Sequence, residues 1–529
     1  MKIKIYIKNN YSWLLLVIYI ITRLFLVNIN FAEIGDSNNF LLLADQINKG
    51  IFPAFTNRLP MYPLLLSVGI RFMDGYLWGR ILSLLFSIGI LIMLYKIANL
   101  LFDRRGIAVL ACALTALNPI FTHDSLRVYS EVVLVFFVLC SFYFFFRENA
   151  RLDFIYIGVF TILAVMTRFE GFILLPVFLI SYALRRKWMK LVYYLLICIV
   201  PFAAIWMLIY FKSSILPTRF LEGLALIFRP RLYDLVPTYI TNLLFMSGFP
   251  ILIFWTIFGF AGLFRSFKKF APLVLFVLFD LFVIYKVHPG TRYFNVLVPI
   301  FSLAIASVLT WRFYRDKFIF AIVGSISIIL FIYLALTVKP FFIFGTIYSS
   351  LITLILSLAA LLIYLLYKQP QGNRIVKNLV ISIVLISLFN LSSSIIWYRR
   401  YDYYTIAQAS RYLANKSEKV AYFDESGVSA WFLRKNGVYF NEDLSDTDQL
   451  SWLKKNNVKY AIYTNEYNEN GELTVLKSAE YSDNFRLVES FEYHRKQWPT
   501  DLLERFGMDG SVFLPVSRLY VSEIYEVIY

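Results

Sequence analysis

Long apolar segments recur along most of this chain and are separated by short polar connections. A helix needs about 20 apolar residues to cross about 30 Å of hydrocarbon. Candidate spans lie at about 11–29, 76–101, 107–122, 129–147, 152–167, 171–184, 189–211, 246–264, 271–287, 294–311, 318–338, 343–367 and 376–397. The sequence therefore predicts a polytopic α-helical membrane protein with about 13 transmembrane helices.

The composition supports this class. Hydrophobic residues make up 59% of the chain and charged residues 16%, whereas soluble domains carry about 25% charged residues. The net charge is +17, yet acidic residues outnumber basic ones from Trp397 onward. The basic excess thus lies in the apolar part, where the preference for cytoplasmic Lys and Arg produces it. This distribution argues against a nucleic-acid partner.

Basic clusters fall in every second connection when the N-terminus is placed in the cytoplasm. The short connections concerned hold Arg104-Arg105, Arg147 and Arg151, Arg185-Arg186-Lys187, Lys268-Lys269, Arg312 and Arg315, and Arg374 and Lys377. Residues 1–397 then form a transmembrane domain, with a first external loop at about 30–75. Residues 398–529 lie outside the membrane.

The external tail has a different pattern. Residues 419–423, 437–440 and 458–463 read as short strands, and 429–435 and 446–456 carry helical spacing. Strands that alternate with helices predict a small α/β unit. We therefore expect a C-terminal extracytoplasmic α/β domain.

The spans 152–167 and 171–184 are short, and a polar hinge from Thr167 to Gly171 separates them. A helix of 14 residues rises only about 21 Å, so the hinge is expected below the outer surface. Polar, non-helical backbone at that depth is tolerated where it lines a water-filled cavity. Arg168 and Glu170 are accordingly candidates for a substrate cavity.

Asp36 begins an amphipathic stretch in the first external loop, which Gly50 closes. One interpretation is an N-cap for an interfacial helix. The other is a general base, because an ordinary Asp is ionised at neutral pH and can accept a proton from a hydroxyl group. Both roles can belong to the same residue.

Further candidates flank other external turns. Arg58 and Tyr62 sit in a segment with two prolines and suit either interfacial anchoring or, for Arg58, a phosphate ligand. Arg127 and Glu131 lie at the next external turn, where Glu131 starts a span. Lys286, His288 and Arg292 are cationic or titratable groups on the external side of the membrane, where the preference for cytoplasmic Lys and Arg does not place them. Their partner could be a lipid phosphate, anionic headgroups or the acidic tail.

In this order the motifs resemble the GT-C membrane glycosyltransferases, particularly relatives of the dolichyl-phosphate-mannose protein mannosyltransferases and the lipid A aminoarabinose transferases. The resemblance covers about residues 11–300. It depends on Gly35-Asp36-Ser37, Arg58-x-Pro60-x-Tyr62-Pro63, Gly79-Arg80-x-x-Ser83, Asn118-Pro119 with Ser130-Glu131, Arg168-x-Glu170-Gly171, and Arg292-Tyr293 with Pro299.

The resemblance implies inverting transfer of a hexosyl or pentosyl group from a polyprenyl-phosphate-linked donor, in a prokaryotic plasma membrane. Asp36 would be the general base, and Arg292 and Arg58 would bind the donor phosphate. The family often has a second acid directly after this Asp, where this chain has Ser37, which favours its more divergent branches. No metal or other cofactor is implied, and the acceptor could be a glycan, a lipid or a protein.

Two other functions remain open at the level of sequence. A transporter or flippase of lipid-linked sugars would also have many spans and external arginines, although such proteins commonly contain internal repeats with broken helices. A glycan polymerase or ligase would contact two lipid-linked substrates.

Overall fold

The structure of the chain is a computed structural model. It describes residues 15–27, 33, 35–51, 58–148, 151–213, 256, 259–264, 266–287, 291–307, 403–423, 427–440, 445–465, 473–494 and 519–529. Contacts divide the chain into two compact units. The first comprises Met1–Val27, Phe52–Leu65 and Gly79–Tyr398, and the second comprises Asn28–Ile51, Leu66–Trp78 and Arg399–Tyr529.

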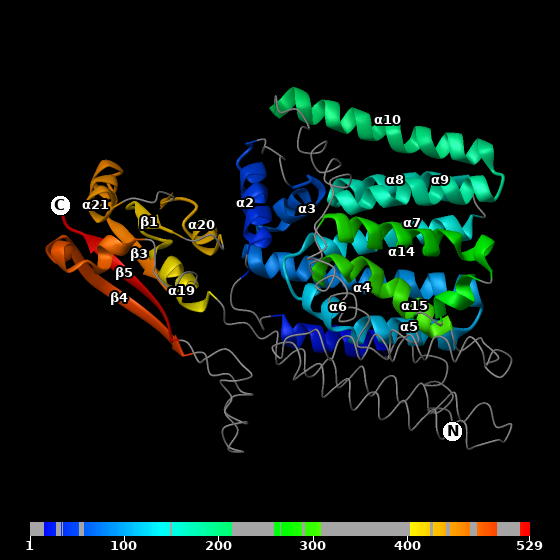
Figure 1. Cartoon of the computed structure of the whole chain (residues 1–529), viewed down its shortest axis with the longest axis horizontal. Coiled ribbons are helices and arrows are strands. Elements are labelled where there is room, and N and C mark those ends of the chain that lie inside the picture. The colour runs from blue at the N-terminus through cyan, green and yellow to red at the C-terminus, as the bar shows by residue number, and fades with distance from the viewer. Residues whose placement is uncertain are drawn as a thin grey trace, which may run out of the picture. The chain divides into compact units, whose positions relative to one another are not determined.

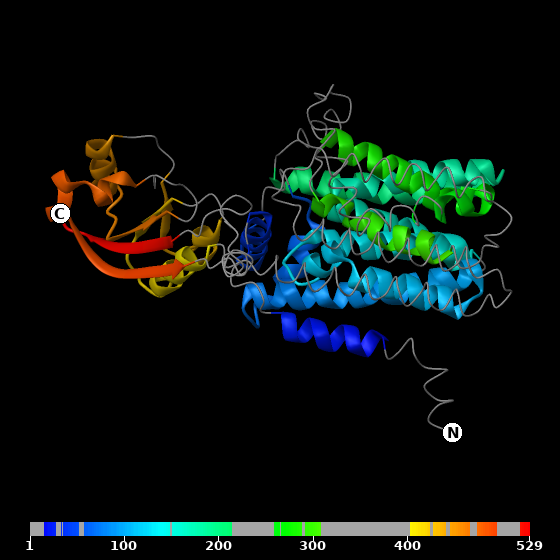
Figure 2. The same ribbon diagram turned by 60° about the horizontal axis from the view of Figure 1, so that its bottom comes forward.

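The first unit is helical, and its described helices lie side by side and nearly parallel (Figures 1 and 2). In chain order they are a first helix at Leu15–Leu26, α4 (Gly75–Phe102, which begins in the second unit), α5 (Arg105–Leu117), α6 (Pro119–Asp124), α7 (Ser130–Arg147), α8 (Arg151–Thr167), η1 (Phe169–Ile173), α9 (Leu174–Leu184), α10 (Trp188–Ser213), α14 (Phe267–Val287), η3 (Thr291–Leu297) and α15 (Val298–Ser307).

Three helices of the described residues are long and apolar enough to cross a membrane: Gly75–Phe102, Ser130–Arg147 and Trp188–Leu208. Shorter apolar helices overlap the predicted spans at 11–29, 107–122, 152–167, 171–184 and 294–311. α14 covers the span predicted at 271–287. The spans predicted at 318–338, 343–367 and 376–397, most of that at 246–264, and the boundary after residue 397 lie outside the described residues.

The predicted single span at 107–122 is wrong in detail, because two helices occupy it. α5 ends at Leu117, and Asn118 adopts an extended backbone conformation before α6. Proline disfavours helical geometry in the residue before it, and Pro119 opens α6 at its first position. The Asn118 side chain then caps α6 by accepting hydrogen bonds from the backbone N–H groups of Ile120 and Phe121.

α7 forms the buried centre of the first unit, since most of its side chains are inaccessible to solvent. It packs against α8 and η3, while α10 packs against α8 and α9 and leaves most of its apolar side chains exposed. Such a difference is expected where one helix is enclosed by protein and another faces lipid. The polar side chains of α7 are therefore held in a protein interior.

The second unit contains α2 (Asp36–Asn48) from the first external loop, the last part of α3 (Met61–Gly69) and a C-terminal sheet. The sheet has the strand order β2-β1-β3-β5-β4, with β1 at Val420–Tyr422, β2 at Gly437–Tyr439, β3 at Tyr460–Thr464, β4 at Phe485–His494 and β5 at Leu519–Val527. β1 pairs in parallel with β2 and β3, and the last two pairings are antiparallel.

Helices cover both faces of this sheet (Figure 1). Alternate residues of β1 point to opposite faces, as in any strand. Val420 and Tyr422 pack with Leu413 of α19 (Tyr404–Leu413), whereas Ala421 packs with Leu453 of α21 (Asp446–Lys455). A short helix, α20 (Val428–Phe432), connects β1 to β2. β1 and β2 lie in the first two segments predicted as strands, and β3 overlaps the third and ends one residue beyond it.

Candidate functional site

The predicted hinge between the two short spans is present. α8 ends at Thr167, Arg168 is extended with φ −154° and ψ 152°, and η1 follows before α9 begins. Gly171 allows the close return of the chain, because a Cβ atom on it would lie 2.4 Å from the backbone carbon of Ala164. The hinge thus places Arg168 and Glu170 between two helices rather than along one.

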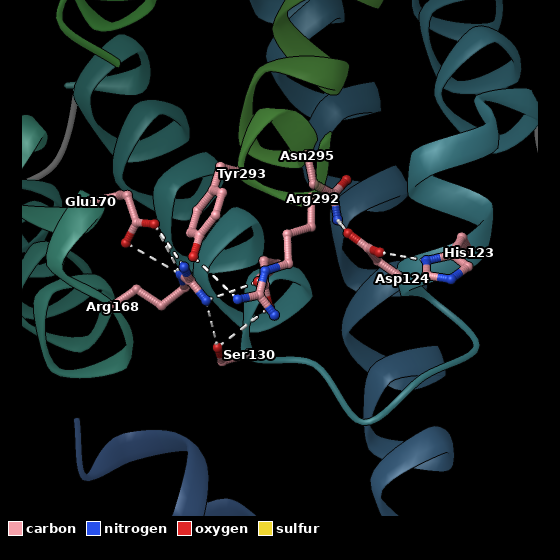
Figure 3. Close-up of polar contacts among 9 residues, drawn as sticks. His123, Asp124, Ser130, Arg168, Glu170, Arg292, Tyr293 and Asn295 are labelled. Atoms are coloured by element: carbon pink, nitrogen blue, oxygen red, sulfur yellow. Dashed lines mark hydrogen bonds and ion pairs between the residues drawn. The ribbon is translucent and has the colours of Figure 1, made fainter. Parts of the chain in front are cut away.

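Arg168 is the centre of a polar cluster (Figure 3). Its guanidinium group lies 2.8 Å from Glu170 Oε1 and 2.9 Å from Glu131 Oε1, and it donates a hydrogen bond of 3.2 Å to Ser130 Oγ. Glu131 stands in the first turn of α7, as predicted, and its side chain is only 5% exposed. Two carboxylates therefore neutralise one nearly buried cation.

Arg292 joins the cluster from η3. Its Nη2 donates a hydrogen bond of 3.1 Å to the Tyr293 hydroxyl, and its Nε lies 3.7 Å from Glu131 Oε1. The Tyr293 ring lies 5.2 Å from the guanidinium carbon of Arg168 and 5.1 Å from that of Arg292, within cation–π range. The Arg292 side chain is 32% exposed and that of Arg168 is 14% exposed, so Arg292 is the more accessible cation.

A second polar group adjoins η3 (Figure 3). Asn295 donates a hydrogen bond of 2.8 Å to Asp124 Oδ2, and His123 Nδ1 lies 2.9 Å from Asp124 Oδ1. Asp124 ends α6, between the apolar helices α5 and α7, and is fully buried. Burial and the nearby Glu131 carboxylate hold the pKa of Asp124 well above its usual value, despite the opposing charges of Arg292 and Arg127.

Asp36 lies in the second unit, as the first residue of α2. Its interpretation as the N-cap is wrong: Gly35, with φ 57°, occupies that position and no side chain caps the helix. A glycine reaches this backbone conformation easily because it has no Cβ. Asp36 instead supplies an acidic group in the first turn, where the positive end of the helix stabilises an anion.

The remaining predicted residues occupy varied positions. Arg58 is half-buried, Tyr62 is fully buried in the first turn of α3, and Arg127 is only 2% exposed. The backbone carbonyl of Arg127 accepts a 2.6 Å hydrogen bond from Ser83 Oγ. Lys286 stands in the last turn of α14, and His288 lies outside the described residues.

The structure therefore gathers Glu131, Arg168, Glu170 and Arg292 of the predicted set. Asp36 belongs to the other compact unit. The sequence reasoning did not select Asp124 and Asn295, which are 171 positions apart and have no shared local pattern. The sequence signals near them are the polar run around His123 and the lone acid Asp280 inside the apolar α14.

This cluster can bind an anion through the guanidinium and phenol donors of Arg292 and Tyr293, while Glu131 and Glu170 balance the charges of the two arginines. A guanidinium group can present two parallel donors to a phosphate. Across the residues described above, no group of three or more His, Cys, Asp and Glu side chains suits a metal ion. The expectation of metal-free chemistry stays a prediction.

Comparisons with known proteins agree with the arrangement of helices. The family model described as dolichyl-phosphate-mannose-protein mannosyltransferase matches residues 57–210. The crystal structure of ArnT from Cupriavidus metallidurans bound to undecaprenyl phosphate is similar, with a TM-score of 0.60, 12% identity, and coverage of 97% of this chain and 98% of that chain. The apo state of the same protein gives a TM-score of 0.56 at 13% identity, with the same coverage.

The cryo-EM structure of the arabinofuranosyltransferase AftD from Mycobacteria is also similar, with a TM-score of 0.50 and 13% identity. That match covers 97% of this chain but only 40% of the AftD chain. A search of the curated proteins gives no match. From its helical first unit, the order of its motifs and these structural likenesses, the chain has the fold of the GT-C membrane glycosyltransferases.

Proposed function

We propose that this protein is an integral membrane glycosyltransferase. It moves a hexosyl or pentosyl group from a polyprenyl-phosphate-linked donor to a glycan, lipid or protein acceptor on the extracytoplasmic face. Transfer inverts the configuration at the sugar, and Asp36 acts as the general base. The reaction needs no metal or other cofactor.

The observation that carries this proposal is the pair of guanidinium groups around Tyr293. Arg168 is held by Glu131 and Glu170, while Arg292 is more exposed and contacts the same ring. We therefore assign donor phosphate binding first to Arg292, and a positioning role to Arg168. Arg58, Lys286 and His288 are further proposed phosphate ligands, and Tyr62 and Arg127 are proposed to line the substrate cavity.

The proposed reaction is a single displacement. The acceptor hydroxyl oxygen attacks the anomeric carbon and transfers its proton to the Asp36 carboxylate. The bond from the anomeric carbon to the phosphate oxygen breaks, and its electron pair stays on the departing polyprenyl phosphate. Negative charge grows on that oxygen during transfer, so a fixed cation beside it stabilises the transition state more than the ground state.

The proposed membrane arrangement places the N-terminus in the cytoplasm and counts about 13 spans. The C-terminal sheet and its helices then form an extracytoplasmic α/β domain of residues 398–529, in a prokaryotic plasma membrane. The basic connection Arg185-Arg186-Lys187 before α10 supports the orientation. The bound undecaprenyl phosphate of the similar ArnT structure supports a polyprenyl-phosphate partner.

The test is release of free polyprenyl phosphate when the purified protein is incubated with a panel of labelled polyprenyl-phosphate sugars and a membrane extract as acceptor source. The wild-type protein should release it, and Asp36→Asn should not, while still binding polyprenyl phosphate. Asp103→Asn, an exposed acid between α4 and α5, is the matched control. Movement of intact donor across vesicles without release would instead indicate a flippase, and a lengthened lipid-linked glycan would indicate a polymerase.

A further inference from the structure

The C-terminal sheet and the helix that begins with Asp36 pack together within the second unit. α20 follows the first strand of the sheet and contacts α2 directly. Gly427 caps α20 with φ +73°, and a Cβ atom on it would lie 3.1 Å from the Cβ of Asn38. A Cβ atom at this position would therefore push Asn38 of α2 away by a few tenths of an ångström.

Asn38 is the contact point on α2 and is completely buried. Its Nδ2 donates a 2.8 Å hydrogen bond to the backbone carbonyl of Glu33, and its Oδ1 accepts a 2.7 Å hydrogen bond from the Tyr76 hydroxyl. Glu33 and Asn38 flank Asp36 in sequence, so the first of these bonds fixes the turn from which the Asp36 side chain projects. A buried amide that loses such partners is left with unsatisfied polar groups, so these hydrogen bonds hold the turn in place.

Aromatic contacts continue this connection into α20. The Tyr76 ring is stacked at 6.2 Å on Trp431 and meets the edge of Phe432 at 5.6 Å. Both aromatic residues belong to α20. The path from the turn before Asp36 to α20 thus consists of two hydrogen bonds and two aromatic contacts.

The far end of α2 has its own contact with the same segment. Arg434 Nε lies 3.7 Å from Asp45 Oδ1, and its guanidinium group lies over the Trp431 ring at 4.2 Å. α2 is therefore held near both ends by residues 427–434. Contacts at two points along one helix fix its axis as well as its position.

We propose that α20 positions the general base, with Asn38 as the positioning residue through which the C-terminal sheet acts on Asp36. The inference deepens the proposed function and depends on it for the role of Asp36. The C-terminal segment is then part of the transfer machinery, and its docking on α2 sets the direction of the Asp36 carboxylate toward the acceptor hydroxyl. Loss of this docking should reduce turnover and leave binding of the lipid donor intact.

Gly427→Ala tests the docking, and the chain offers a close control in Gly50→Ala. Both glycines have φ +73°, but a Cβ at Gly50 meets nothing within 4 Å. The backbone strain is therefore similar, and only Gly427→Ala presses on α2. Misplacement of a catalytic group by about 1 Å can cost about 100-fold in rate. The added Cβ requires a shift of only a few tenths of an ångström, so we expect kcat to fall by about 3- to 5-fold in Gly427→Ala. Asn38→Ala, which removes both hydrogen bonds of this side chain, should lower kcat further. Trp431→Phe, which keeps a ring, should retain most of the activity that Trp431→Ala loses.

Two readouts separate this inference from the proposed function. The donor KM and the affinity for polyprenyl phosphate should not change in any of these variants. Hydrogen exchange of the amides in the first half of α2, around Asn38, should accelerate in Gly427→Ala but not in Gly50→Ala, whose strain falls at the opposite end of α2. An unchanged kcat or unchanged exchange in Gly427→Ala would overturn the inference while the function stands. Absence of transfer by the wild-type protein would instead remove the proposed function, and the exchange experiment would still decide whether α20 holds α2.

Discussion

Arg168 Nη1 and Glu131 Oε1 lie 2.9 Å apart, although one residue is in the hinge after α8 and the other is in the first turn of α7. Both side chains are largely buried, with 14% and 5% of their surfaces exposed. The ion pair therefore links the hinge between α8 and α9 to α7, the central helix of the first unit. Glu131 also faces Arg292, so one carboxylate sets the orientation of both cations.

Removal of this carboxylate should destabilise the protein. Breaking a buried ion pair by deleting one partner costs about 3–5 kcal/mol, because the other charge stays buried and loses its compensation. We expect Glu131→Ala to lower the free energy of unfolding by about that amount, as measured by denaturant unfolding of the detergent-solubilised protein. Glu131→Gln keeps an acceptor for Arg168 and should lose less. Equal stability of Glu131→Ala and wild type would contradict the structural role.

Arg292 should govern the affinity for the lipid phosphate. Hydrogen bonds to charged groups contribute about 1.5–3 kcal/mol, so Arg292→Ala should weaken binding of polyprenyl phosphate by about 10- to 100-fold. Arg292→Lys should restore only part of it, since an ammonium group cannot offer two parallel donors. Binding can be measured by native mass spectrometry in detergent. Arg105→Ala, which removes an exposed arginine at the start of α5, is the control and should bind like wild type.

The hinge and the start of α7 could be predicted from sequence because each has a local cause. Two short apolar segments around Thr167–Gly171 required a break, and the break lies at Arg168. The amphipathic pattern after Gly35 likewise predicted α2, which ends two residues before Gly50. Such features depend on hydrophobic periodicity and on glycine, and both can be read within one segment.

Contacts between distant segments could not be predicted in this way. The partnership of Asp124 with Asn295 and the stacking of Tyr76 on Trp431 join residues that share no periodicity. No local pattern groups the first external loop with the C-terminal sheet in one unit. β4 and β5 were not predicted either, although they form the longest pairing of the sheet.

The raised pKa of Asp124 should make the stability of the folded protein depend on pH. Burial raises that pKa in the folded state, so the unfolded chain loses the proton at a lower pH than the folded protein does. The contribution of Asp124 to stability is therefore largest below its unfolded pKa of about 3.9 and declines as the pH rises toward the folded value. Asp124→Asn keeps the shape and cannot titrate.

Asp124→Asn should consequently melt at a progressively higher temperature than wild type as the pH rises from 4.5. The gain should stop once the pH passes the folded-state pKa of Asp124, so the pH window is about as wide as the pKa shift. Differential scanning fluorimetry in detergent at closely spaced pH values would measure it. Asp103→Asn, at an exposed position, provides the baseline. A difference that does not vary with pH, or one that shrinks as the pH rises, would contradict the raised pKa.

Asp280 should be destabilising where it stands. It lies fully buried in α14, and neither of its carboxylate oxygens has a hydrogen-bond partner in the part of the chain that the structure describes. Leaving a buried polar group unsatisfied costs about 1–3 kcal/mol, and more when it is charged. Leucine places methyl groups near the positions of the two oxygens, so Asp280→Leu should raise the free energy of unfolding by about 1–3 kcal/mol.

Asp153→Leu, in the same unit, is the matched control for Asp280→Leu. Asp153 is equally buried, but both of its carboxylate oxygens accept hydrogen bonds from Arg147 Nε, at 2.9 and 3.0 Å. Asp153→Leu removes a satisfied partner and leaves the Arg147 guanidinium without it, so this variant should be less stable than wild type. Opposite signs for the two Asp→Leu changes, measured by the same unfolding assay, are the expected result. If both variants are destabilised to a similar extent, Asp280 has a favourable partner in the folded protein. That result would contradict the prediction that the Asp280 carboxylate destabilises the fold.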